Sequence, residues 1–334
     1  VLLHNIGSLV VDGSTQTSLG TISSDLLTFK DNSSDTQVLA QKVNGEDVNV
    51  AEVSRRFDTN LSLVTSNVAG DEDGAYAVTL GYSIEKLGLL QTTSGVDRAN
   101  YENDALWQGL SITASSSVER NEFGTSIGNG ITRGEKGNIV FRGNADNALT
   151  LSGDNSYEGK TWLTDNAKVV FGKDHAFGST EAVRIDAGSS VDLAGHSQSV
   201  GALYALGAGA LSGTADASLT VEGDALITGA NSEYMGDFLL QGETRIDNVE
   251  SLGHGNAELA GAQASVIISG ASGALTNTFI GGSETAVSVV DSTVDFGDKI
   301  ADYAGALNVD GTSSLSLVAG DSFNNKVTVA EGGH

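Results

Sequence analysis

Short stretches in which apolar and polar residues alternate recur along the second half of the chain. Such alternation puts aliphatic side chains on one face of a β-strand and Thr, Ser, Asp or Arg side chains on the other. Turn-forming residues bound these stretches, as in Gly-Asp-Asn at 153–155 and Gly-Ser-Ser at 188–190. The pattern predicts an all-β chain of many short strands. The alternating stretches are 149–151, 169–171, 183–186, 191–193, 219–222, 294–296, 307–310, 315–317 and 327–329.

Two segments of this pattern are copies of each other. Residues 151–156, Leu-Ser-Gly-Asp-Asn-Ser, match residues 227–232, Ile-Thr-Gly-Ala-Asn-Ser, and a Tyr-x-Gly triplet follows at 157–159 and at 234–236. The offset of 76–77 residues suits three or four rungs of about 20–25 residues each, where a rung is one turn of a coil of strands. A β-sandwich, the competing architecture, would instead show hairpin signals. We therefore expect a right-handed parallel β-helix, or β-solenoid, with about three short strands per rung.

This rung length sets the number of rungs that the chain can hold. About 15 rungs would fit into 334 residues.

Asn155 and Asn231 occupy the same place in the two copies. They have two candidate roles: to stack their side-chain amides along the axis, or to adopt the left-handed backbone of a turn.

Glycine and proline usage fits this architecture. The chain has 43 glycines and no proline, although average usage predicts about 17 prolines. Gly permits turns with positive φ, whereas Pro would remove a hydrogen-bond donor from a strand that is paired on both sides. A chain made mostly of central strands therefore has many places for Gly and few for Pro.

Charge and cysteine content narrow the classes of partner. The formal net charge is −26, which argues against nucleic acid and against anionic membranes, because both attract basic proteins. No apolar run approaches the ~18 residues of a membrane helix, so we expect no membrane insertion. The lack of Cys excludes disulfides and thiolate metal sites, and it fits Gram-negative secretion of an unfolded chain. No signal peptide is visible and the chain opens within the pattern, so we expect a mature or excised fragment.

The regularity of the pattern differs along the chain. We expect one continuous domain over 1–334, with regular repeats at 146–334 and a less regular part at 1–145. Residues 51–57 and 83–87 have the character of short helical turns.

One segment breaks the alternation and carries aromatic residues. Residues 97–108 read Asp-Arg-Ala-Asn-Tyr-Glu-Asn-Asp-Ala-Leu-Trp-Gln, and we expect them to form a loop that protrudes from the solenoid. Arg98, Tyr101 and Trp107 are the candidate binding residues of this loop, since exposed aromatic and Arg side chains often dominate binding interfaces. The alternative is that Tyr101 and Trp107 cap the interior of the N-terminal part.

Enzymatic chemistry finds no support in the residue pattern, and we expect no catalytic residue, no metal site and no cofactor. The nearest match to a serine protease motif is Gly-Asp-Ser-Phe at 320–323, which lacks the second Gly and fits a turn. None of the five histidines pairs at metal-ligand spacing. Parallel β-helices that cleave polysaccharides use paired carboxylates, but in so acidic a chain a pair such as Asp71 and Asp73 carries little information.

Residues 149–203 resemble the autotransporter-associated β-strand repeat. The match begins with Leu-Thr-Leu-Ser-Gly-Asp-Asn-Ser-Tyr-Glu-Gly-Lys-Thr at 149–161 and ends with Val-Asp-Leu-Ala-Gly-His-Ser-Gln-Ser-Val-Gly-Ala-Leu at 191–203. Phe177 stands where the family pattern has Leu, and a degraded second copy covers about 224–268. The clear match covers about one sixth of the chain. The motif is specific to passengers of type V secretion, but it carries little information about the ligand.

The resemblance implies a β-helix passenger domain, secreted across the outer membrane and displayed on the surface of a Gram-negative bacterium. It further implies an AIDA-type adhesin, which would self-associate in trans between cells to give aggregation and biofilm, or bind a host extracellular-matrix protein or glycan. Two alternatives remain open. The chain could be a polysaccharide-degrading enzyme on the same fold, or a structural stalk that presents another domain.

Overall fold

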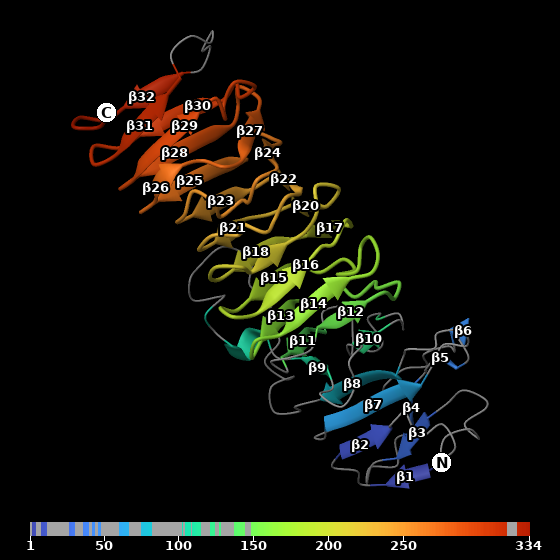
Figure 1. The fold of residues 1–334 in the computed structure, drawn as a ribbon. Helices are drawn as coiled ribbons and strands as arrows, with labels where there is room; N and C mark the ends of the chain where they lie inside the picture. The colour runs from blue at the N-terminus through green and yellow to red at the C-terminus, as the bar shows by residue number, and fades with distance from the viewer. Residues whose placement is uncertain are drawn as a thin grey trace. The chain divides into compact units, whose positions relative to one another are not determined.

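The computed structural model describes residues 137–143, 148–318 and 326–334 without a break, and before residue 137 it describes short strands and a few residues beside them. In this part of the chain the protein is all-β, and its parallel strands are stacked as a β-solenoid of about nine turns (Figure 1). One 3-10 turn, η2 (Asp104–Leu106), is described. The predicted fold class is confirmed, while the right-handed sense stays a prediction. The expected helical turns at 51–57 and 83–87 lie outside the described residues.

The chain divides into an N-terminal unit, Val1–Glu181, and a C-terminal unit, Ala182–His334. In the N-terminal unit the early strands mix parallel and antiparallel pairs, and stacked parallel pairs then join β9 to β11 to β13 and β10 to β12 to β14. Its strands are β1 (Leu2–His4), β2 (Ser8–Val11), β3 (Leu27–Lys30), β4 (Thr36–Leu39), β5 (Lys42–Val43), β6 (Glu46–Asp47), β7 (Asn60–Ser66), β8 (Ala75–Gly81), β9 (Leu110–Ala114), β10 (Asn121–Phe123), β11 (Ile139–Arg142), β12 (Leu149–Leu151), β13 (Thr161–Thr164) and β14 (Lys168–Phe171).

In the C-terminal unit every described strand pair is parallel. One stack, here called the long sheet, contains β15 (Ala182–Ile185), β18 (Ala202–Ala205), β21 (Ala225–Ile227), β23 (Glu243–Ile246), β25 (Ser265–Ser269), β28 (Ala286–Val290), β30 (Ala306–Val309) and β32 (Val327–Val329). A second stack, here called the five-stranded sheet, contains β17 (Ser197–Val200), β20 (Ser218–Val221), β22 (Asp237–Leu240), β24 (Asn256–Leu259) and β27 (Thr278–Gly281). The remaining side is formed by β16 (Ser190–Asp192) with β19 (Leu211–Ser212), and by β26 (Ser272–Ala274), β29 (Thr293–Gly297) and β31 (Ser314–Leu317).

Register in the long sheet gives the length of one rung. Val183 lies opposite Leu203 at its start, and Leu307 lies opposite Val327 at its end. The expected rung of about 20–25 residues is close to the spacing of these partners. The described residues form about nine turns, whereas the expected count of about 15 rungs referred to all 334 residues and stays a prediction. The antiparallel pairs before residue 115 show that early strands also pair in ways other than stacked rungs.

The two sequence copies lie on different sheets. Leu151 belongs to β12, which pairs with β10 and β14, whereas Ile227 belongs to β21 of the long sheet. The sequence offset between the copies is more than three and fewer than four rungs of the observed length. The repeated motif therefore encodes a turn between two strands, and it does not fix which side of the solenoid that turn occupies.

The interior is filled by aliphatic and phenylalanine side chains of the strands together with three inward tyrosines. Tyr157, Tyr234 and Tyr303 are each followed by x-Gly and are at most 2% exposed. Their hydroxyl groups bond to Thr161 Oγ1 (2.8 Å), the Asp237 carbonyl (2.9 Å) and Thr285 Oγ1 (3.2 Å), respectively. Tyr303 marks a third Tyr-x-Gly turn that the sequence comparison missed, since no Asn-Ser pair precedes it.

Each of the first two tyrosines lies under a glycine of the next rung. Gly178 and Gly253 have φ of +63° and +68°, and a Cβ on either would crowd the backbone of Tyr157 or Tyr234. Ser179 and His254, which follow these glycines, donate their backbone N–H to the same two tyrosine carbonyls. The Phe-Gly and Leu-Gly dipeptides of the sequence motif are therefore turns that pack directly on the tyrosine of the rung before.

Asn155 does not act through amide stacking. Its Oδ1 accepts the backbone N–H of Ile127 (2.8 Å), and its Nδ2 donates to the carbonyl of Ala176 (2.6 Å). The side chain thus connects backbone groups 28 residues before it and 21 residues after it.

Asn231 makes the corresponding pair of bonds in the C-terminal unit. Its Oδ1 accepts the N–H of Leu211 (2.9 Å) and its Nδ2 donates to the carbonyl of Ser251 (2.8 Å), in a position with no exposed surface. The two candidate roles drawn from the sequence are thus both replaced by a third, in which the amide joins the backbones of neighbouring rungs.

Candidate binding surface

Of the three residues expected to bind a partner, only Trp107 is described. It lies directly after η2, is 1% exposed, and has Lys160 Nζ 5.4 Å from its ring centroid. This burial fits the alternative of a packing residue, because a ring covered by protein offers no contact surface. Arg98 and Tyr101 lie outside the described residues.

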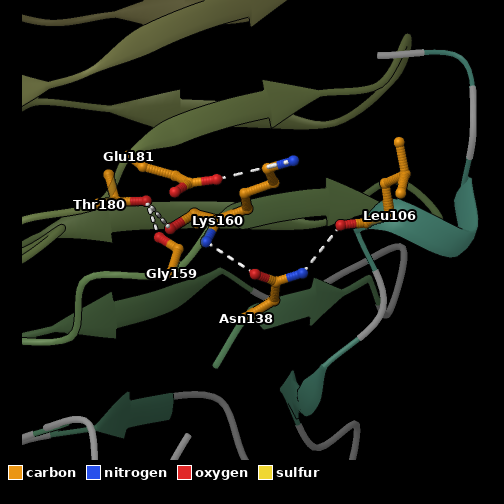
Figure 2. A network of polar contacts seen from close by, with 7 residues as sticks. Leu106, Asn138, Gly159, Lys160, Thr180 and Glu181 are labelled. Carbon is orange, nitrogen blue, oxygen red and sulfur yellow. Dashed lines mark hydrogen bonds and ion pairs between the residues drawn. The ribbon is translucent and has the colours of Figure 1, made fainter. Parts of the chain in front are cut away.

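Around Lys160 the structure brings together a polar network that the sequence did not indicate (Figure 2). Asn138 Nδ2 donates to the carbonyl of Leu106 (2.9 Å), and Asn138 Oδ1 accepts the backbone N–H of Lys160 (2.9 Å). The ammonium group of Lys160 lies 3.7 Å from Glu181 Oε1, and only 6% of the Lys160 side chain is exposed. A third polar residue, Thr180, donates its hydroxyl to the carbonyl of Gly159 (2.7 Å).

This network joins neighbouring backbone segments and holds one buried charge. Glu181 and the Trp107 ring both lie beside the ammonium group of Lys160, and a buried cation needs such compensation. Its chemistry is that of an ion pair within the fold, and no described group beside it has the arrangement of a nucleophile and base. We therefore assign it to packing rather than to binding.

Groups that could hold a metal ion are not assembled in the part of the chain that the structure describes, where no three His, Asp or Glu side chains converge. His175 and His254 lie exposed in turns, and His196 is partly exposed. The Gly-Asp-Ser-Phe segment at 320–323 and the pair Asp71 and Asp73 lie outside the described residues. Among the described residues, no helix has the length and hydrophobicity that a membrane crossing requires.

The C-terminal unit presents extended outward surfaces, because its strands are stacked in register over several rungs. On the long sheet the outward side chains of adjacent rungs form a column, which begins with Arg184 opposite Tyr204 and ends with Asn308 opposite Thr328. Arg184 and Tyr204 are 9% and 4% exposed, whereas Arg245 further along has 57% of its side chain exposed. The accessible part of this column therefore lies on the later rungs.

Both arginines of the C-terminal unit lie in this column, and each has a carboxylate two residues away on its own chain segment. Arg184 Nε bonds to Asp186 Oδ1 and Arg245 Nε to Glu243 Oε1, both at 2.7 Å. The Arg245–Glu243 pair is the exposed one of the two, and exposed pairs contribute little to stability, about 0–1 kcal/mol. This pair does fix the direction in which the guanidinium group of Arg245 presents its remaining donors.

The sequence reasoning missed these columns because register decides them. Residues that are neighbours on the surface come from different rungs, and the sequence separation of such neighbours varies from rung to rung. In comparisons with known proteins, no family model, no curated protein and no solved structure matches the chain.

Proposed function

We propose that this chain is a surface-displayed passenger segment of a Gram-negative autotransporter, and that it acts as an adhesin. Self-association between cells, or binding to host matrix protein or glycan, would take place along an outward face of the solenoid. The proposal draws on the repeat-like residues at 149–203 and on the zero-cysteine, acidic composition.

One observation carries the proposal: stacked rungs present outward side chains in register along whole sheets. The long sheet of the C-terminal unit repeats the same outward position on eight strands. Such a surface offers many weak contacts of the same geometry, and many copies on one cell multiply them into avidity. A protein with this design binds through an extended face rather than through one pocket.

The experiment is to display residues 1–334 on otherwise non-adherent cells. Settling of the cells and their binding to a panel of matrix proteins and glycans would be scored together. We expect a gain in at least one of the two over cells that display an unrelated segment of equal length. If the two kinds of cell behave alike in both assays, the chain is a stalk or an enzyme rather than an adhesin.

A further inference from the structure

Three outward residues of the long sheet form an apolar–basic–apolar column. Leu226, Arg245 and Ile267 lie beside one another on β21, β23 and β25. Leu226 and Ile267 are partly exposed although they point away from the interior, and Arg245 between them is exposed. Along the sequence, Leu226 and Arg245 are closer to each other than Arg245 and Ile267 are.

The five-stranded sheet carries the acidic counterpart on the same unit. Leu239, Glu258 and Ile280 lie beside one another on β22, β24 and β27, with the same two sequence intervals as in the first column. The two aliphatic side chains are partly exposed and Glu258 is exposed. The inward side chains of these strands are buried, so the three residues between them point outward. The buried inward residues are Phe238, Leu240, Ala257, Leu259 and Phe279.

The two columns match in spacing and oppose each other in charge. Adjacent strands are about 4.8 Å apart in both sheets, so aliphatic, charged and aliphatic groups recur at the same intervals. Because the charged residue is central in each column, Arg245 meets Glu258 whichever way one column runs against the other. The flanking Leu and Ile side chains then also meet, and they exclude water from the ion pair.

From this match we infer that a second copy of the chain docks here, with the Leu226–Arg245–Ile267 column of one copy against the Leu239–Glu258–Ile280 column of the next. The inference deepens the self-association part of the proposed function and rests on it. In a chain with a net charge of −26, like copies repel one another unless a local attraction compensates. An Arg245–Glu258 contact between two aliphatic flanks supplies that attraction.

The predicted contact is heterologous, because it joins two different surfaces of identical chains. Each copy keeps one unused column after docking, so association continues beyond a dimer unless the geometry closes a ring. Purified protein should therefore show a concentration-dependent series of oligomers rather than a single dimer.

The test uses the purified 334-residue chain and measures oligomer formation by sedimentation velocity at low salt. Arg245→Glu and Glu258→Arg each place like charges against each other, and each should weaken association about tenfold or more. An equimolar mixture of these two variants should recover association. Arg245→Glu carries a carboxylate in both columns and Glu258→Arg carries a guanidinium group in both, so every contact between unlike variants joins opposite charges. The double variant with both substitutions should recover it as well.

Two matched controls reverse charge away from the columns. Glu233→Arg lies in the turn after β21 and Lys299→Glu in the turn after β29. Both should leave association close to that of the unmodified chain, and circular dichroism of every variant should show intact β-structure. Leu226→Ser should weaken association without any change of charge.

A mixture that associates no better than the single variants would overturn the inference, as would controls that lose association equally. If the unmodified protein stays monomeric while displayed cells still bind matrix, the column contact is wrong and the adhesin proposal stands. If displayed cells show neither settling nor binding, both fail.

Discussion

Asn155 in the N-terminal unit and Asn231 in the C-terminal unit make the same two hydrogen bonds, each joining a backbone N–H of an earlier rung to a carbonyl of a later one. The shared role explains why the Gly-x-Asn-Ser turn recurs in the sequence. Only a side chain with both an acceptor and a donor at its end can make such a bridge, and Asn has the length for it.

Replacing Asn231 by Leu should destabilise the fold by about 3 kcal/mol, since it leaves the buried N–H of Leu211 and the carbonyl of Ser251 unpaired. Urea unfolding followed by circular dichroism measures the change. Asn256→Leu is the control, because Asn256 is exposed on β24 and its replacement should change stability by only about 0.5 kcal/mol or less. Equal losses in the two variants would show that the bridge contributes nothing.

Asn277 offers the opposite case for the same substitution. It is fully buried, and neither atom of its amide group has a hydrogen-bond partner among the described residues. Because a buried polar group without partners costs about 1–3 kcal/mol, Asn277→Leu should raise the free energy of unfolding. Parallel urea titrations of Asn277→Leu and Asn231→Leu would give shifts of opposite sign. A loss of stability in both would contradict the assignment of Asn277 as unpaired.

Much of this fold was predictable from alternation alone. All nine alternating stretches overlap strands of the structure, because their inward positions are apolar and, apart from Val170 on β14, their outward positions are polar. β23 was missed since its inward Thr244 is polar, and β13 was missed since outward Trp162 is as buried as the inward residues. Alternation in the sequence therefore identifies a strand only where one face of the strand is buried and apolar and the other is exposed and polar.

The turn glycines give a second stability prediction with a close internal control. Gly253 and Gly209 share a left-handed backbone, with φ of +68° and +71°. A Cβ at Gly253 would overlap the carbonyl of Tyr234, whereas a Cβ at Gly209 meets nothing within 4 Å. Gly209→Ala should therefore lower the free energy of unfolding only through backbone strain, by about 1–2 kcal/mol. Gly253→Ala should lower it by roughly an additional 1–3 kcal/mol, because its Cβ also overlaps the backbone of Tyr234. Thermal unfolding of the two variants side by side tests this, and equal losses would argue against the close packing.

The buried tyrosines predict how stability responds to alkaline pH. Burial raises the pKa of Tyr157, Tyr234 and Tyr303 above the ordinary value near 10, because it disfavours the phenolate. Above about pH 10 the unfolded chain releases these protons and the folded chain keeps them, so stability falls as pH rises. Each such tyrosine contributes a slope of about 1.4 kcal/mol per pH unit.

Tyr234→Phe isolates one of these contributions. At neutral pH it should cost about 1 kcal/mol, since the hydroxyl no longer donates to the Asp237 carbonyl. Between about pH 10 and pH 12 its stability should fall less steeply than that of the unmodified chain, by the slope of one proton. Urea midpoints across this range provide the measurement, and parallel curves would show that the Tyr234 hydroxyl ionises equally in both states.

The candidate binding surface was much less accessible to sequence reasoning than the strands. Trp107 stands in a polar segment, so nothing in the sequence shows that Lys160, which comes much later in the chain, covers its ring. The Arg245 and Glu258 columns depend on register, and rungs of unequal length break any fixed period. A site built from particular residue types at a fixed sequence spacing would have been detectable in the sequence. A surface assembled from residues of several rungs has no such fixed spacing.

Settling of cells that display the chain is the direct readout of the proposed adhesion through outward faces of the solenoid. Settling would be recorded over a series of salt concentrations for the unmodified chain and for sets of outward substitutions on each face. If adhesion takes place through an outward face, salt should change the rate of settling and at least one set of outward substitutions should abolish it. Settling that is indifferent both to salt and to substitutions on every face would contradict this mode of adhesion.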